Sequence, residues 1–226
     1  CLTRAMNQGI SLSNPKVLLA LDLKEMESLF APGLGGGPLP MLEERLHALR
    51  ELGTAYQRLG GPLELLAEGG GSAIGLSQAI ARHLPSWEDS RVLDGQRLRF
   101  LKRAQLCVAM IFGRYGGQGL GEFRDIGKLT AFADYRLPQI LRHLEILTLS
   151  GELSEAIDQK KPFARGTPEE VQLRCATVVA VERLKVAFAR QWPSITPLHV
   201  DYLLWKSAVS NSDQLPEHHR CRCTDY

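Results

Sequence analysis

Apolar residues recur along the chain at the spacing of helices, and glycine and proline separate the apolar stretches. The clearest example covers 41–59, where one apolar stripe faces a row of charged residues. The members of the stripe are Leu42, Leu46, Leu49, Leu52 and Tyr56. The run Gly60-Gly61-Pro62 ends this stretch, so the pattern predicts a helix bounded by a turn.

Helix-start signals precede two other periodic stretches. Asn14-Pro15 combines a capping side chain with a proline whose missing N–H costs nothing in a first turn, and the apolar period continues to Phe30. Thr167-Pro168-Glu169-Glu170 predicts a capping box at the start of a helix over 168–192. Periodicity predicts further helices over 63–68, 72–83, 96–115, 137–147 and 196–207, and short helical turns over 122–132.

The remaining segments are rich in glycine or polar. Loops are predicted over 32–40 and 113–121, and the chain is polar after Asn211. The pattern indicates neither an alternating strand nor a hairpin turn between apolar runs, and it shows no internal repeat. The sequence therefore predicts an all-α fold, a single helical domain over 1–226 with a polar C-terminal tail, 212–226, packed on it.

Composition narrows the class of protein. Hydrophobic residues make up 44% and charged residues 23%, which is typical of a soluble globular protein, and eighteen apolar residues never occur in succession, which argues against a membrane-spanning helix. The net charge of +2 is too balanced for broad cationic binding of nucleic acid. Five scattered cysteines do not form a disulfide framework, so we expect a reducing, intracellular compartment.

The chain begins at Cys1 without an initiator methionine, so we expect either a removed upstream part or a fragment of a longer chain.

Common catalytic and metal-binding motifs are missing. The sequence contains no phosphate-binding P-loop, nucleophile elbow, H-E-x-x-H or paired C-x-x-C motif, and the glycines at 117–121 do not belong to a βαβ unit. The His and Cys residues of 218–223 are ligand types that suit zinc, but their C-x-C spacing is tight and two arginines lie beside the thiols. We therefore favour a polar tail held by side-chain hydrogen bonds and predict no metal site.

The most unusual segment covers 123–139, where aromatic, acidic and basic residues alternate. Asp134 precedes a predicted helix, where the helix dipole favours an ionised carboxylate. Either Asp134 only caps this helix and pairs with Arg136, or it stabilises a cation next to a planar leaving group that Phe132 and Tyr135 hold by stacking. The residues alone leave both interpretations open.

Two further charged positions have similar alternatives. Asp201 lies in an apolar stretch, where an unpaired carboxylate is costly, so it either pairs with Arg183 or Arg136 or acts as a second carboxylate beside Asp134. Lys102 opens a strongly apolar stretch and either forms an ion pair or binds a phosphate.

Six sequence blocks closely resemble the queuosine salvage proteins, a family of queuosine 5′-phosphate N-glycosylases. The blocks are LKRAQL at 101–106, FRDIGKLTAFADYRLPQ at 123–139, EVQLRCA at 170–176, AVERL at 180–184, VDYLLW at 200–205 and HRCRCTDY at 219–226. Their order and spacing agree with the family along the whole chain. The string FADYRLPQ is the most specific of the matches.

The resemblance implies a fold similar to the helical DNA glycosylases and hydrolysis of the N-glycosidic bond of queuosine 5′-monophosphate, which releases queuine for tRNA modification. Asp134 would be the catalytic carboxylate that stabilises the ribosyl oxocarbenium ion and orients or deprotonates the attacking water. Phe132, Asp201 and Tyr202 would form the pocket for the base and its side arm, and Lys102 would bind the 5′-phosphate.

The same resemblance implies a small-molecule nucleotide as the partner, without a metal, an organic cofactor, direct nucleic acid binding or a membrane. It implies a cytoplasmic location, with the nucleus and the mitochondrion as alternatives, and leaves the oligomeric state open. Relatives in the family extend further upstream, and they carry acids where this chain has Gln172 and Lys206. Two other functions therefore remain open: a catalytically weak or inactive binding protein for queuosine-type nucleosides, and a glycosidase for another modified nucleotide.

Overall fold

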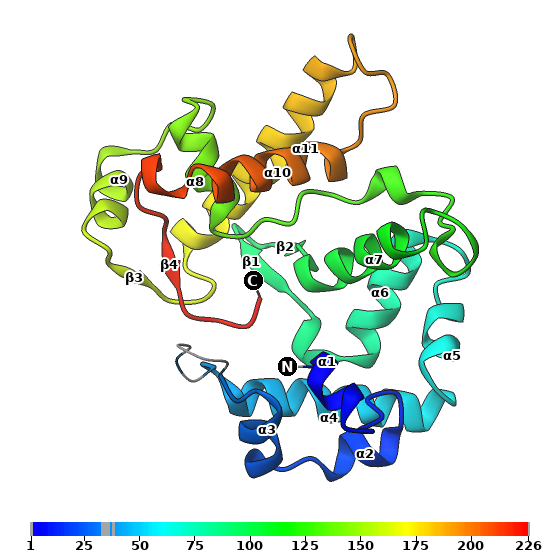
Figure 1. Ribbon diagram of the computed structural model, residues 1–226. Helices are drawn as coiled ribbons and strands as arrows, with labels where there is room; N and C mark the ends of the chain where they lie inside the picture. The colour runs from blue at the N-terminus through cyan, green and yellow to red at the C-terminus, as the bar shows by residue number, and fades with distance from the viewer. Residues whose placement is uncertain (1, 33–36, 38, 226) are drawn as a thin grey trace.

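The computed structural model describes residues 2–32, 37 and 39–225, and this part of the chain is mainly helical (Figure 1). Cys1, Tyr226 and most of the loop predicted over 32–40 lie outside the described residues. The helices are α1 (Leu2–Asn7), α2 (Pro15–Ala20), α3 (Leu23–Leu29), α4 (Leu42–Leu59), α5 (Pro62–Ala67), α6 (Ala73–His83), α7 (Lys102–Arg114), α8 (Arg136–His143), α9 (Gly151–Asp158), α10 (Pro168–Phe188) and α11 (Pro197–Ser210). The strands are β1 (Ser90–Leu93), β2 (Gln96–Arg99), β3 (Pro162–Phe163) and β4 (Arg220–Cys221). None of the described helices has the length and hydropathy needed to cross a lipid bilayer.

The first predicted helix begins where expected but is divided in two. The Asn14 side chain accepts a hydrogen bond from the Lys16 N–H (3.0 Å), which confirms the predicted start of α2. Asp22 then forms a capping box with Glu25, in which each side chain accepts from the other residue's backbone N–H (both 2.8 Å). Because an N-cap residue has an extended backbone, this capping box separates α3 from α2.

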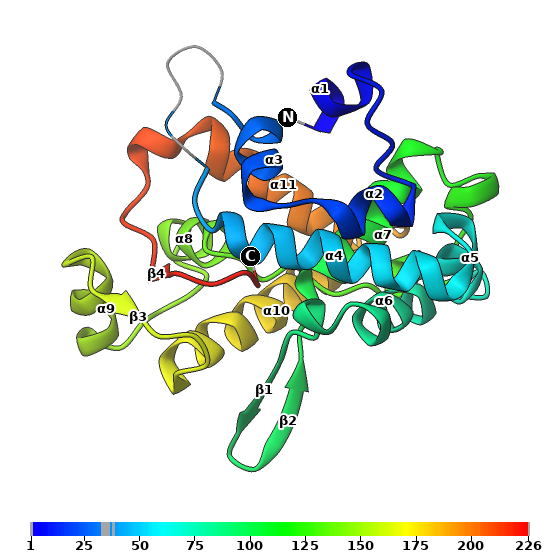
Figure 2. The same cartoon turned by 90° about the horizontal axis from the view of Figure 1, so that it is seen from below.

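The prediction of a purely helical chain without a hairpin was wrong at 90–99. There β1 and β2 pair antiparallel, with Leu93 opposite Gln96, and the hairpin extends away from the helices (Figure 2). Asp94 and Gly95 form the turn and both have positive φ (49° and 76°), as a two-residue hairpin turn requires. The helix predicted over 96–115 therefore begins only at Lys102.

The predicted capping box at the start of α10 is also absent. Thr167 is the N-cap, but its hydroxyl is buried without a hydrogen-bond partner among the described residues. The Glu170 carboxylate accepts instead from the Gly166 N–H (3.1 Å). A capping box occurs at α11, where Thr196 and His199 exchange side-chain to backbone bonds.

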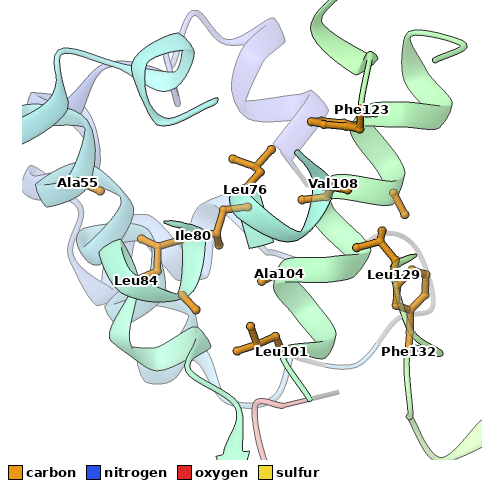
Figure 3. Packing of buried hydrophobic residues seen from close by; sticks show 13 residues of the cluster. Ala55, Leu76, Ile80, Leu84, Leu101, Ala104, Val108, Phe123, Leu129 and Phe132 are labelled. Atoms are coloured by element: carbon orange, nitrogen blue, oxygen red, sulfur yellow. The ribbon is translucent and has the colours of Figure 1, made fainter. Parts of the chain in front are cut away.

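Buried apolar residues form three clusters. One joins α1, α2, α3 and α4, a second joins α6 and α7 to the segment 123–132, and a third joins α8, α10 and α11. Figure 3 shows Leu129 and Phe132 beside α7, on the side opposite α6. The segment that leads to Asp134 is therefore part of the second hydrophobic cluster.

The C-terminal tail is fixed to the rest of the protein by strand pairing and by one buried carboxylate. β4 runs parallel to β3, with Phe163 opposite Cys221. The Asp225 carboxylate is fully buried and accepts from Arg165 (2.6 and 2.9 Å) and from Arg91. Side-chain hydrogen bonds to Asp225 thus contribute to holding the described end of the tail.

Replacing Asp225→Ala tests this attachment. The variant removes the nearer carboxylate of the mostly buried Arg91 guanidinium and leaves it only the Asp89 carboxylate, 3.7 Å away, and breaking such a buried pair costs up to about 3–5 kcal/mol. We expect urea unfolding to show a loss of this size, whereas Asp213→Ala, on the exposed part of the tail, changes the free energy of unfolding by less than about 0.5 kcal/mol. Equal losses in the two variants would contradict the assignment.

Candidate active site

The segment 129–135 approaches the start of α8 and is held along its length by contacts from other elements. Gln105 of α7 holds its first part with two hydrogen bonds. The Gln105 Oε1 accepts from the Thr130 N–H (2.8 Å), and its Nε2 donates to the Thr130 Oγ1 (2.9 Å). A paired amide of this kind fixes the backbone of the segment against α7.

Asp201 of α11 holds the middle of the same segment. Its Oδ2 accepts a hydrogen bond from the Phe132 N–H (2.7 Å), and its carboxyl group is buried. The sequence had suggested Arg183 or Arg136 as the partner of Asp201, but the backbone of Phe132 takes this place. The Phe132 ring is only 6% exposed because it packs in the second hydrophobic cluster (Figure 3).

Asp134 caps α8, as one interpretation of the sequence predicted. Its Oδ1 accepts from the Arg136 N–H (2.8 Å) and from the Leu137 N–H (3.2 Å). The predicted pair between the Asp134 and Arg136 side chains is replaced by this backbone contact, because the Arg136 guanidinium donates to Gln139 (3.1 Å) and lies over the Tyr135 ring. The cap leaves the Asp134 Oδ2 without a role in α8 and does not exclude chemistry at this carboxylate.

Lys102 lies at the first turn of α7 and is 9% exposed. Leu101 before it has a left-handed backbone (φ 47°), which is costly for a branched side chain and is typical of functional sites. Leucine has no polar group with which to cap a helix, and the Asp89 Oδ2 supplies the cap by accepting from the Lys102 N–H (3.3 Å).

The ionisable groups of Lys102 and Asp201, which are buried, and of Asp134, which is half-buried, act on one another. The pKa of Asp201 is raised to about 7, mainly by burial and also by the Asp134 charge, against the opposing effects of the Phe132 N–H and of Lys102. Burial also raises the pKa of Asp134 against the opposing effects of Lys102 and the two cap hydrogen bonds. The pKa of Lys102 is lowered by burial, although both carboxylates oppose this. For Asp134, desolvation outweighs the helix dipole that the sequence emphasised.

Other predicted residues lie away from this cluster. Tyr202 is 57% exposed on the outer face of α11 and stacks on Trp205, with ring centroids 6.4 Å apart. Gln172 and Lys206, where relatives were expected to carry acids, are also exposed. The structure thus brings together Asp134, Asp201, Lys102 and the backbone of Phe132, but it places Tyr202 on the surface.

Two cavities lie near the cluster without including its carboxyl groups. A hollow of about 320 Å³ is lined by Tyr135, which follows Asp134, and by residues 218–222 of the tail, among them Arg220 and Arg222. A larger, mainly apolar cavity of about 610 Å³ lies between α4, α6 and α7, where Arg103 and Cys107 contribute to its wall. The side chains of Lys102 and Arg103 therefore lie in different surroundings, although the two residues are adjacent in sequence.

Sequence reasoning missed two residues that support the site. Asp89 and Arg174 form a buried ion pair (2.5 and 2.8 Å) across 85 positions of sequence. Arg174 lay in one of the family-like blocks but had no assigned role, and the spacing of Glu170 and Arg174 on one helix face was the available signal. Within the described ranges, no three His, Cys, Asp or Glu side chains come together in a way that could hold a metal ion.

Comparison with known proteins gives one consistent family. The family model described as queuosine salvage protein matches residues 1–226. The chain is similar to proteins named queuosine 5′-phosphate N-glycosylase/hydrolase from several organisms. The protein from Sphaerobacter thermophilus is 36% identical over 227 residues, which cover 100% of this chain and 69% of the relative. The protein from Dictyostelium discoideum is 34% identical, over 97% of this chain and 68% of the relative. The protein from Mus musculus is 32% identical, over 100% of this chain and 70% of the relative.

The raised pKa of Asp201 predicts how Asp201→Asn changes stability with pH. A carboxyl with a folded-state pKa of about 7 and an unfolded value near 3.8 stabilises the fold below pH 4, and this contribution is lost as the pH rises through 7. Asparagine can still accept from the Phe132 N–H. We therefore expect the variant to gain stability over the wild type by up to about 1.4 kcal/mol per pH unit between pH 4 and 7.

The measurement is the free energy of unfolding by urea at several pH values. Asp158→Asn is the control, because the exposed Arg142 bond lowers the pKa of Asp158 and its removal must change stability in the opposite direction at neutral pH. A difference between Asp201→Asn and wild type that does not vary with pH would refute the buried, mostly protonated state of Asp201.

Proposed function

Since this chain belongs to the queuosine salvage protein family, we propose that it hydrolyses the N-glycosidic bond of queuosine 5′-phosphate and releases free queuine. The observation that carries the proposal is the half-buried Asp134 carboxylate, which is fixed by two backbone N–H groups and lies within the electrostatic reach of Asp201 and Lys102. A carboxylate fixed in advance and partly removed from water is an arrangement that stabilises a developing sugar cation.

The chemistry of the base makes such a carboxylate especially important. Queuine is a 7-deazapurine, so its five-membered ring has no N7 that an enzyme could protonate to activate the leaving group. Catalysis must then depend more on stabilising positive charge on the ribose. In the proposed step the bond between C1′ and the base nitrogen breaks, and its electron pair leaves with the base. Water then adds to C1′ and gives up a proton, which passes by way of Asp134 to the nitrogen of the departing base, leaving ribose 5-phosphate and free queuine.

Asp134 has two roles in this proposal. Its negative charge stabilises the oxocarbenium ion, and its oxygen orients the attacking water and accepts the proton that the water loses. The two cap hydrogen bonds occupy Oδ1, so Oδ2 is the oxygen available for the water. The backbone N–H groups of Arg136 and Leu137 thus hold one oxygen of the Asp134 carboxylate, while the other oxygen remains available for the reaction.

We propose that the other site residues bind the substrate. Asp201 adds negative charge to the cluster and pairs with the cationic amine of the queuine side arm, while Phe132 bounds the base and Lys102 binds the 5′-phosphate. The arginines of the hollow beside Tyr135 offer further cationic groups for an anionic nucleotide. We also propose that the helical arrangement is related to the helical DNA glycosylases, which cleave the same kind of bond.

Replacing Asp134→Asn tests the proposal directly. Asparagine keeps the size and one acceptor of the cap but removes the charge, so we expect kcat for queuine release from queuosine 5′-phosphate to fall by about 10²–10³-fold. Release of free base is measured by chromatography, and Asp158→Asn on the exposed surface is the control. Undiminished release by Asp134→Asn would exclude this residue as the catalytic carboxylate, and a wild type that binds the nucleotide without releasing base would be a binding protein.

The pH dependence of kcat/KM provides a second test. The cluster has a net negative charge for the sugar cation only when both carboxyls are ionised, and burial places the pKa of Asp201 at about 7. We expect kcat/KM to rise as the pH passes through 7, with an apparent pKa that belongs to the coupled pair. Asp201→Asn should lose this rise and stay near the value that wild type has at low pH. A profile that falls over the same range would contradict the charge assignment.

A further inference from the structure

The buried ion pair between Asp89 and Arg174 lies behind the candidate site and meets both segments that present its charges. Arg174 of α10 is 1% exposed, and its two terminal nitrogens donate to the two oxygens of Asp89 (2.8 and 2.5 Å). Asp89 directly precedes β1, and β1 lies against α10 (Figure 1). The pair is a two-bond contact between a planar guanidinium and a carboxylate, which fixes direction as well as distance.

Each member of the pair makes one further contact toward the site. The Arg174 Nε donates to the Ala133 carbonyl oxygen (3.2 Å), one residue before Asp134. The Asp89 Oδ2 accepts from the Lys102 N–H (3.3 Å) and thereby caps α7. One ion pair therefore connects the backbone that carries Asp134 with the backbone that carries Lys102.

The surroundings restrict the ion pair to this geometry. The Arg174 guanidinium lies 4.0 Å from the centre of the Phe100 ring, and the Glu170 carboxylate lies 3.6 Å from one of its nitrogens. The Asp89 carbonyl accepts from the Phe100 N–H (2.9 Å), so the backbone of Asp89 is fixed too. A guanidinium held on one face by a ring and at its edge by carboxylates has little freedom to move.

We propose that Arg174 and Asp89 are positioning residues for the hydrolysis, because together they set the separation between the Asp134 carboxylate and the Lys102 ammonium. The inference rests on the proposed function for its activity readout. Neither residue needs to touch the nucleotide. Their contribution is to the orientation of the charged groups, for which small displacements have large kinetic effects.

The test is Arg174→Lys, which keeps the positive charge but removes the planar group. A lysine ammonium has no rigid fork with which to hold both Asp89 oxygens and the Ala133 carbonyl at once. We expect kcat for queuine release to fall by about 100-fold while KM changes by less than about threefold, since orientation and not binding is lost.

Arg142→Lys is the matched control. Arg142 forms an equivalent two-bond pair with Asp158 (both bonds 2.8 Å), but this pair is exposed and lies away from the cluster. We expect its kcat and KM to stay within about twofold of wild type. If Arg174→Lys is folded by circular dichroism and loses no more activity than Arg142→Lys, the positioning role is overturned.

A second readout does not depend on activity. In the NMR spectrum of Arg174→Lys, the amide resonances of both Ala133 and Lys102 should shift, because Arg174 bonds the Ala133 carbonyl directly and is connected to the Lys102 N–H through Asp89. A shift confined to Ala133 would contradict the shared ion pair. If Arg174→Lys does not fold, Asp89→Asn takes its place, with the same expected kcat loss and the same two amides as reporters. A wild type that releases no queuine would refute the proposed function, while the NMR comparison would still decide the positioning role.

Discussion

Two carboxyl groups and one ammonium group lie together in this protein, partly or fully removed from water, and the arrangement of the site depends on the resulting imbalance of charge. Burial raises the pKa of both Asp134 and Asp201, and the single charge of Lys102 can neutralise only one of them. The second negative charge is unfavourable in the free protein. It becomes favourable when a positive sugar forms beside it, which is the condition for stabilising a transition state more than a ground state.

The fold stabilises this costly cluster with contacts to backbone as well as to side chains. The first amides of α8 point at Asp134, and the Phe132 N–H points at Asp201. The backbone of Thr130 is held by Gln105, so the segment that bears Asp134 is fixed on several sides before any ligand arrives. Donors and charges that are fixed in advance need not reorganise during the reaction, and this is where electrostatic catalysis gains most.

Local signals in the sequence predicted much of the helical structure. The start of α2 at Asn14 and the end of α4 at Gly60 follow from capping chemistry and from the helical period. The hairpin was missed because its strands are short and carry arginines in place of an alternating apolar pattern, although the Asp94-Gly95 dipeptide is a strong turn signal. The contact between Asp201 and Phe132 spans 69 positions and that between Arg174 and Asp89 spans 85, and spacing along one chain does not contain such pairings. The resemblance to a family suggested that Asp134 and Asp201 share a site, but it did not identify the ion pair that supports them.

A crystal structure of the Asp134→Asn variant with intact queuosine 5′-phosphate would test the central claim most directly, because this variant should hold the substrate without cleaving it. We expect the ribose C1′ to lie about 3–3.5 Å from the side chain at position 134 or from a water bonded to it. The base would then lie next to Phe132 and Asp201. A nucleotide bound with its ribose elsewhere, for example in the apolar cavity beside Arg103 and Cys107, would contradict the account.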